Sequence, residues 1–224
     1  MNKWELIETA LVPGSETQMS LFHCGNDYSI CVNGKELMNT RLHGSEESLA
    51  ELGCANMIGR DDGCVLVGGL GMGFTTAATL RHVGKKAKIV IAELVPAVEE
   101  WNRDYLGHYA GFPLKDSRCT LQIADVADVL RKQHSTYDSI LLDVDNGPNG
   151  MTQEANNWLY WNEGLQVIRK ALKPKGILAI WSAHQDRGIL KRLAQVGYEV
   201  SEHRVPARSS GGGGRHIIWV AKNT

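Results

Sequence analysis

The sequence lacks several features that would place it in a specialised class of protein. It has no apolar run of membrane-spanning length, and its first residues, Met1–Glu5, lack the apolar core of a signal peptide. It also lacks an excess of either charge, because 24 basic and 25 acidic side chains leave a formal net charge of −1. Nucleic-acid-binding surfaces are normally basic. We therefore expect a cytoplasmic protein that binds neither membranes nor nucleic acid.

Cysteine is present but forms no recognisable pattern. The five cysteines are odd in number, scattered, and include no Cys-x-x-Cys pair. Disulfide frameworks and zinc sites normally show paired spacings, so we expect free thiols, no disulfide and no bound metal. The 224 residues suffice for one large domain, or for one domain with a small appendage.

The rest of the sequence is organised around an apolar run that ends in glycines. Residues 64–73 read Cys-Val-Leu-Val-Gly-Gly-Leu-Gly-Met-Gly, and an alanine-rich segment follows. The run indicates a buried parallel strand, and the segment after it indicates a helix. Glycine lets the backbone pass close to a ligand, which the first amides of the helix would face. Gly69, Gly71 and Gly73 therefore predict a nucleotide- or nucleoside-binding turn.

The residues before this strand have a β pattern. Turn signals at Asn26-Asp27 and Asn33-Gly34 separate short apolar segments, which predicts three or four antiparallel strands. We assign residues 1–42 to a small N-terminal β appendage and residues 43–224 to a Rossmann-like domain.

Beyond the glycine turn, predicted strands and helices alternate. Further strands are expected at 87–92, 120–123, 137–142, 177–181, 198–205 and 216–221. The last two follow each other without a helix and should pair antiparallel. The pattern predicts an α/β fold with a doubly wound, seven-stranded sheet that ends in a C-terminal antiparallel hairpin.

Two helices carry more specific expectations. Ser45 is predicted to be the N-cap of a helix that runs to Met57. A later helix is predicted to bury Trp158, Trp161 and Leu165 on one inward stripe, because these residues recur at three- and four-residue steps.

Three strands of the predicted parallel core lead into an acidic residue: Glu93, Asp125 and Asp143. Ligands of doubly wound sheets bind beyond the carboxyl ends of the strands. Glu93 lies 20 residues after Gly73, which suits a carboxylate that accepts hydrogen bonds from both hydroxyls of a ribose; a solvated carboxylate is the alternative. Asp125 either accepts from an adenine amino group, caps the helix that begins at Val126, or does both.

Asp143 and Asp145 are the catalytic candidates. A primary ammonium has a pKa near 10, so only about one molecule in a thousand is a neutral nucleophile at pH 7. A carboxylate that holds the ammonium and takes its proton would supply a general base. The alternative is a turn, because Asp, Asn, Gly and Pro, which make up most of residues 143–148, all favour turns.

The glycine spacing bears on the cofactor. Gly-x-Gly-x-Gly departs from the Gly-x-Gly-x-x-Gly of dinucleotide-binding domains, which also have no need of a closing antiparallel hairpin. Both features favour S-adenosylmethionine or its decarboxylated form over a nicotinamide. An NAD-dependent oxidoreductase is the less favoured alternative.

Several stretches together resemble the spermidine synthase family: Val65 to Gly73, Glu93, Asp125-Val126-Ala127, Tyr137 to Asp143, and Leu159-Tyr160-Trp161 up to Leu172-Lys173-Pro174. The resemblance implies an aminopropyltransferase built on the class I S-adenosylmethionine-dependent methyltransferase fold, and a homodimer. It also implies roles for the candidate residues: cofactor approach for Gly69, Gly71 and Gly73, ribose binding for Glu93, adenine binding for Asp125 and acid–base catalysis for Asp143.

The segments that would hold the acceptor depart from the family pattern. Asp143-Val144-Asp145-Asn146-Gly147-Pro148 replaces Asp-Ser-Ser/Thr-Asp-Pro, and Gly44-Ser45-Glu46 stands where the family has Tyr-His-Glu. The sequence therefore predicts transfer of an aminopropyl or methyl group to an amine-like acceptor, without identifying that acceptor. The alternative is a non-catalytic protein that binds the adenosyl nucleoside and has lost the polyamine site.

Overall fold

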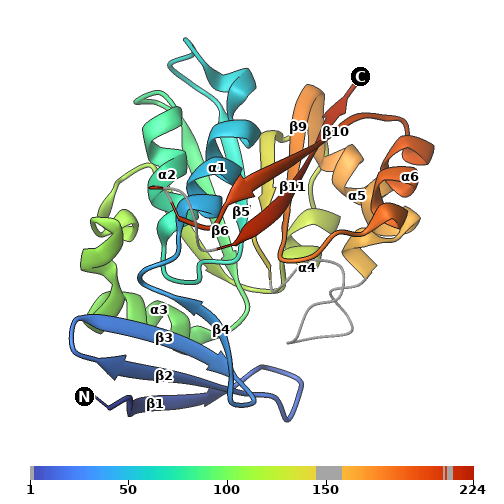
Figure 1. Ribbon diagram of the computed structural model, residues 1–224. Helices are drawn as coiled ribbons and strands as arrows, with labels where there is room; N and C mark the ends of the chain where they lie inside the picture. The colour runs from blue at the N-terminus through green and yellow to red at the C-terminus, as the bar shows by residue number, and fades with distance from the viewer. Residues whose placement is uncertain (1–2, 145–157, 209, 211–213) are drawn as a thin grey trace.

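The computed structural model describes all residues except 1–2, 145–157, 209 and 211–213, and shows two β-sheets (Figure 1). The small sheet has four antiparallel strands in chain order: β1 (Glu5–Leu11), β2 (Gln18–Cys24), β3 (Asp27–Val32) and β4 (Lys35–Asn39). Asn33 and Gly34, which join β3 to β4, have positive φ angles of 48° and 78°. This is the conformation of a type I′ turn, whose twist matches that of the strands and which favours Asn-Gly.

The large sheet contains the remaining strands: β5 (Cys64–Gly68), β6 (Lys88–Glu93), β7 (Cys119–Ile123), β8 (Tyr137–Leu142), β9 (Leu172–Ser182), β10 (Tyr198–Pro206) and β11 (Arg215–Asn223). Their order is β10-β11-β9-β8-β5-β6-β7; β11 pairs antiparallel with both β9 and β10, and the other pairs are parallel. The predicted seven-stranded sheet with a C-terminal antiparallel hairpin is confirmed. The winding reverses between β5 and β8, which places a binding crevice at their carboxyl ends.

Helices cover both faces of the large sheet (Figure 1). They are α1 (Gly44–Gly53), α2 (Phe74–His82), α3 (Pro96–Trp101), α4 (Val126–Arg131), α5 (Asn162–Ala171) and α6 (Arg187–Val196), with the short elements η1 (Ala55–Met57), η2 (Asn102–Leu106), η3 (Gly107–Ala110) and η4 (Pro113–Lys115). Residues of β5 alternate between two cores: Val65 and Val67 pack with α1, α2 and α3, whereas Leu66 packs with α4, α5 and α6. This alternation is the pleat of a strand buried on both faces. No helix of the described residues is long and apolar enough to cross a membrane.

Two local predictions are wrong. His43, and not Ser45, occupies the N-cap position of α1, and the helix ends at Gly53. Ser45 instead lies in the first turn, where its hydroxyl is hydrogen-bonded to the carboxyl group of Glu46. Trp161 precedes α5 and is 56% exposed, because a short helical turn at residues 158–160 changes the phase of the predicted stripe.

A buried carboxylate joins β8 to its neighbours at the edge of the sheet opposite the crevice. Asp138 accepts hydrogen bonds from Arg60 at 2.8 Å, from Lys173 at 2.7 Å and from the amide of Cys64 at 2.8 Å. Burial alone would raise the pKa of Asp138, but these three donors outweigh it and hold the pKa below its ordinary value.

Asp138→Asn is expected to lower the free energy of unfolding by about 2 kcal/mol at pH 7. It removes the anion between two cations, which are more than a third exposed and therefore partly rehydrate. The deficit should begin to shrink as pH falls below about 4, where the unfolded carboxyl becomes protonated, and should vanish once pH has fallen through the lower pKa of the folded state. Urea denaturation measures both effects. Asp128→Asn, which removes an exposed carboxylate paired with Arg131, is the control and should cost less than about 0.5 kcal/mol; equal effects of the two changes would contradict the prediction.

Candidate functional site

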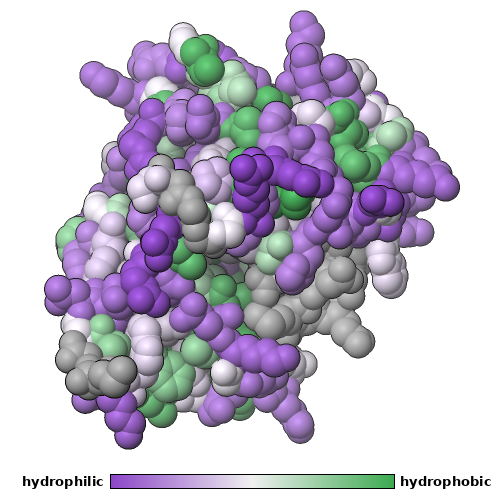
Figure 2. Space-filling model, viewed as in Figure 1, coloured by the Kyte–Doolittle hydropathy of each residue, from purple (hydrophilic) through white to green (hydrophobic). Residues whose placement is uncertain are grey.

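A cleft of about 230 Å³ opens at the carboxyl ends of β5, β6 and β8. The small sheet forms its opposite wall through Met19 of β2 and Leu37 and Met38 of β4. In the space-filling view most of the surface is hydrophilic, and apolar residues reach it in small groups (Figure 2). Because its lining includes these apolar side chains, the cleft is a concave, partly apolar site between the two sheets, as is usual for small-molecule sites.

The three glycines of the turn have different surroundings. Gly69, Gly71 and Gly73 all have positive φ, at 91°, 51° and 85°. A side chain at Gly69 would collide with the carbonyl group of Asp143, and one at Gly71 would come within 3.0 Å of the sulfur of Met38. Gly69 and Gly71 line the cleft, whereas Gly73 occupies the N-cap position of α2 behind it.

Glu93 ends β6 inside the cleft and is 8% exposed. One carboxylate oxygen accepts from the amide of Leu70 and the other from the amide of Val95, each at 2.9 Å. Burial raises the pKa of Glu93, and the backbone donors oppose that shift. The backbone amides of Val95, Leu70, Gly71 and Leu94 all face this carboxylate, and those of Leu70 and Val95 form its hydrogen bonds. A carboxylate offers about four lone-pair sites, so these two hydrogen bonds leave acceptor capacity for a ligand.

Asp125 caps a helix, as one of the two readings of the sequence requires, and its position is compatible with the other. Its side chain caps α4 by accepting from the amide of Ala127 at 2.8 Å, and the residue also lines the cleft beside Ala124. The cap uses one carboxylate oxygen. The arrangement leaves room for the predicted adenine contact, which stays a prediction.

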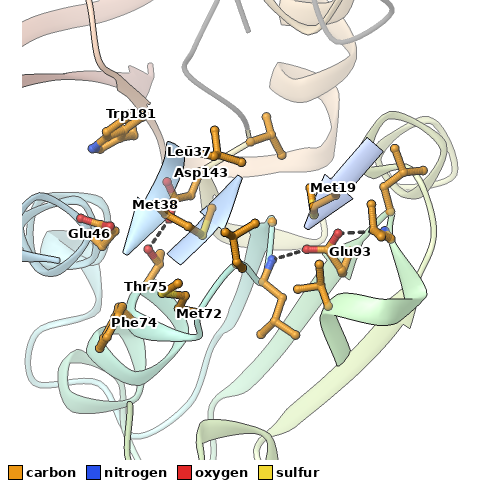
Figure 3. A pocket seen from close by; sticks show the side chains of 18 of the residues that line it. Met19, Leu37, Met38, Glu46, Met72, Phe74, Thr75, Glu93, Asp143 and Trp181 are labelled. Atoms are coloured by element: carbon orange, nitrogen blue, oxygen red, sulfur yellow. Dashed lines mark hydrogen bonds between the residues drawn. The ribbon is translucent and has the colours of Figure 1, made fainter. Parts of the chain in front are cut away.

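Asp143 lies across the cleft from Glu93 and faces a second acid. Thr75 of α2 donates a 2.5 Å hydrogen bond to one Asp143 oxygen, and Glu46 of α1 lies on the same side (Figure 3). Burial raises the pKa of Asp143 to about 6. Burial and the charge of Asp143 together raise the pKa of Glu46 to about 8.

Met38 lies between Glu46 and Glu93 in the cleft (Figure 3). Glu93 and Asp125 come from the ends of the neighbouring strands β6 and β7, whereas Glu46 and Asp143 come from α1 and the end of β8. The cleft therefore offers carboxyl groups to both a nucleoside and a cation. Asp145, the second catalytic candidate, lies outside the described residues.

The cleft is also lined by Glu46, Thr75 and His216. Glu46 belongs to one of the segments that the resemblance assigns to the acceptor, whereas no local sequence signal pointed to Thr75 or His216. His216, the second residue of β11, makes a T-shaped contact with the Trp181 ring, with ring centroids 4.7 Å apart. Among the described residues, no group of three or more His, Cys, Asp or Glu side chains is arranged to hold a metal ion.

Comparison with known sequences gives one family and one curated relative. The family model described as "Spermine/spermidine synthase domain" matches residues 46–195, more than half of the chain. The protein named "Polyamine aminopropyltransferase 2" from Pseudomonas aeruginosa is 27% identical over 156 residues, which cover 65% of this chain and 42% of the relative. The match thus spans about two fifths of the relative's length.

Solved structures show the same fold. A spermidine synthase from Thermotoga maritima has a TM-score of 0.76 and 20% identity over 98% of this chain and 73% of its own. A spermidine synthase in complex with the transition-state analogue AdoDATO has a TM-score of 0.76 and 19% identity over 98% of this chain and 72% of its own. A probable spermidine synthase from Corynebacterium glutamicum has a TM-score of 0.68 and 16% identity over 98% and 80%.

Proposed function

Because this chain belongs to the spermine/spermidine synthase family, we propose that it is a transferase that moves an aminopropyl group from decarboxylated S-adenosylmethionine to an amine. The curated relative is by name an aminopropyltransferase, which is a transferase. The homodimer and the cytoplasmic location that the sequence predicts remain predictions.

The acidic lining of the cleft is the observation that favours decarboxylated S-adenosylmethionine as the donor. Among the described residues, the lining of the cleft includes neither lysine nor arginine but has five carboxyl groups, those of Glu36, Glu46, Glu93, Asp125 and Asp143. The tail of S-adenosylmethionine ends in a carboxylate as well as an ammonium, and this carboxylate would meet repulsion here. The decarboxylated tail ends in an ammonium alone. The cleft therefore favours aminopropyl transfer over methyl transfer.

In the proposed reaction, Asp143 accepts a proton from the ammonium of the acceptor. The freed nitrogen lone pair forms a bond to the carbon beside the sulfonium, and the electron pair of the broken carbon–sulfur bond returns to sulfur. The thioether nucleoside leaves, and the product nitrogen carries the positive charge that sulfur has lost. Glu93 would hold the ribose and Asp125 the adenine, so that the reacting atoms are positioned before the proton moves.

Calorimetric titration with decarboxylated S-adenosylmethionine, S-adenosylmethionine and methylthioadenosine tests the proposal. The decarboxylated donor should bind at least about tenfold more tightly than S-adenosylmethionine, a difference of about 1.4 kcal/mol. Binding of none of the three would end the proposal. Binding without turnover on any diamine or polyamine would instead identify an adenosyl-nucleoside-binding protein, and tight NAD binding would favour an oxidoreductase.

A further inference from the structure

A continuous series of hydrogen bonds leads away from the two neighbouring acids of the cleft, Glu46 and Asp143. It joins the side chains of Glu46, Ser45 and His216. The hydroxyl oxygen of Ser45 lies 2.6 Å from a carboxyl oxygen of Glu46, within hydrogen-bond distance. The same Ser45 oxygen lies 2.8 Å from Nδ1 of His216. Ser45 is fully buried, so its hydroxyl exchanges hydrogen bonds with these two partners and not with bulk water.

The fold fixes this chain by joining two segments that are far apart in the sequence. The amide of Gly44, at the start of α1, donates to the carbonyl of Ala207 just beyond β10 at 2.9 Å. The amide of Ala207 in turn donates to the carbonyl of Gly214 just before β11. The C-terminal hairpin is thereby held against the first turn of α1, which sets His216 beside Ser45.

We propose that Ser45 and His216 form a proton relay that serves the acid pair Glu46–Asp143. The use of this relay in catalysis rests on the proposed function, since aminopropyl transfer leaves one proton on Asp143 in each cycle. His216 is half-buried and is the ionisable group at the far end of the hydrogen-bonded chain. It would pass the proton on to water.

The relay has two settings that differ in the position of two protons. In the first, protonated Glu46 donates to the Ser45 oxygen, and the Ser45 hydroxyl donates to Nδ1 of neutral His216. In the second, the Ser45 hydroxyl donates to the Glu46 carboxylate, and Nδ1–H of His216 donates to the Ser45 oxygen. Passing from the first to the second moves one proton from Glu46 to Ser45 and one from Ser45 to His216. The imidazolium then releases its other ring proton to water, which leaves the Nδ1–H tautomer. The Glu46 carboxylate would then take the proton that transfer leaves on Asp143, the neighbouring acid of the pair.

The pKa values of Glu46 and His216 determine which of these two proton arrangements the ligand-free protein adopts. Burial and the charge of Asp143 raise the pKa of Glu46 to about 8, with a smaller contribution from Glu47 and an opposing one from Ser45. Burial and the nearby His184 lower the pKa of His216. At pH 7 the proton therefore resides on Glu46, and His216 is neutral.

The other charged groups near the acid pair are largely engaged elsewhere. Glu47 lies 3.4 Å from His43 on α1 and 3.4 Å from Arg81 on α2. Glu36, on the β4 wall of the cleft, accepts from Ser29 and Asn39. An acceptor ammonium placed between Glu46 and Asp143 would favour their charged forms, and so would drive a proton from Glu46 towards His216.

Nitrogen-15 NMR of the ligand-free, histidine-labelled full chain tests the relay without any substrate. Between about pH 7 and about pH 9.5, His216 should change from the Nε2–H to the Nδ1–H tautomer, with a midpoint at the Glu46 pKa of about 8. Glu46→Gln should abolish this change. Asp143→Asn should move its midpoint to lower pH, because the charge that raises the Glu46 pKa is gone.

His203 is a control within the same sample. Its Nε2 lies 2.9 Å from the hydroxyl of Ser201, so it also forms a serine–histidine pair, in an exposed position with no carboxylate bonded to that hydroxyl in the described structure. Its signals should not change with Glu46→Gln or Asp143→Asn. A His216 that keeps one tautomer over the whole range, or that titrates identically in both variants and the wild type, would overturn the relay.

Turnover separates failure of the relay from failure of the proposed function. Ser45→Ala should lower kcat for aminopropyl transfer about tenfold and leave KM for the decarboxylated donor unchanged, because it removes a proton path and no donor contact. An unchanged kcat would show that the relay takes no part in transfer. A tautomer change in a wild-type protein without turnover would support the relay and refute the transferase.

Discussion

Asp143→Asn is expected to lower kcat for aminopropyl transfer by a factor of about 10²–10⁴, the usual contribution of a positioned general base. Asparagine keeps the size of the side chain and an oxygen that can accept the Thr75 hydrogen bond, but its amide cannot take a proton from the acceptor. Initial rates with saturating decarboxylated S-adenosylmethionine and a diamine acceptor measure the effect.

The folded state should tolerate this change, so that lost activity cannot be mistaken for lost structure. Burial raises the pKa of Asp143 from 3.8 to about 6, and the ionised carboxylate therefore destabilises the fold above that pH. Removing the charge should leave the thermal midpoint at pH 7.5 equal or slightly higher. Asp128→Asn, on the exposed face of α4, should leave kcat unchanged. A kcat of Asp143→Asn within about threefold of wild type would refute the role as base.

The wild-type rate should also fall on the acid side as Asp143 becomes protonated. The base acts only when ionised, so kcat/KM should fall as pH drops through about 6. An unperturbed aspartate would place this limb near pH 4. The position of the limb therefore reports the burial of Asp143 in the free protein.

The features of the fold that the sequence predicted are those with a local signal. The run from Cys64 to Gly73 predicts β5 and the turn after it, because an apolar run that ends in glycines is compatible with few other local structures. Glu93, Asp125 and Asp143 follow, since the carboxyl ends of parallel strands meet at one edge of a sheet. All three line the cleft.

The features that it missed depend on packing between distant segments. His216 reaches Ser45 across 171 positions, through a strand pairing that no local pattern specifies. Nothing in the sequence around Thr75 distinguishes it from other helix residues, but in the structure its hydroxyl donates a hydrogen bond to Asp143. Serine is a favoured N-cap residue, but the hydroxyl of Ser45 is hydrogen-bonded to Glu46 and His216. These contacts override the local preference of serine for the N-cap position.

The glycines show a second limit of the sequence. The spacing predicted contact with a cofactor at all three positions. Contacts within the protein, however, already explain why two of them must be glycine. Gly69 must be small because the carbonyl of Asp143 lies against it, and Gly71 lies beneath Met38. A glycine-rich turn therefore does two things here: it leaves the cleft open, and it brings Asp143, at the end of β8, close to the start of α2.

Glu93→Gln is expected to weaken binding of the adenosyl donor by about 10- to 100-fold, or about 1.4–2.8 kcal/mol. The buried carboxylate accepts from the amides of Leu70 and Val95, and its remaining lone pairs would accept the ribose hydroxyls. Glutamine has one acceptor oxygen, so its NH₂ group must face either a backbone donor or the ribose. Either outcome removes a hydrogen bond to a charged group.

The same change should lower the free energy of unfolding, because one buried backbone amide loses its acceptor at a cost of about 1–3 kcal/mol, part of which the removal of a buried charge offsets. Calorimetric titration at pH 7.5 and urea denaturation measure the two effects. Glu99→Gln, on the exposed side of α3, makes the same chemical change six residues further along the chain and should alter neither. If Glu93→Gln lowers stability and leaves the affinity for decarboxylated S-adenosylmethionine as it was, then Glu93 only braces the glycine turn, and the ribose lies elsewhere in the cleft.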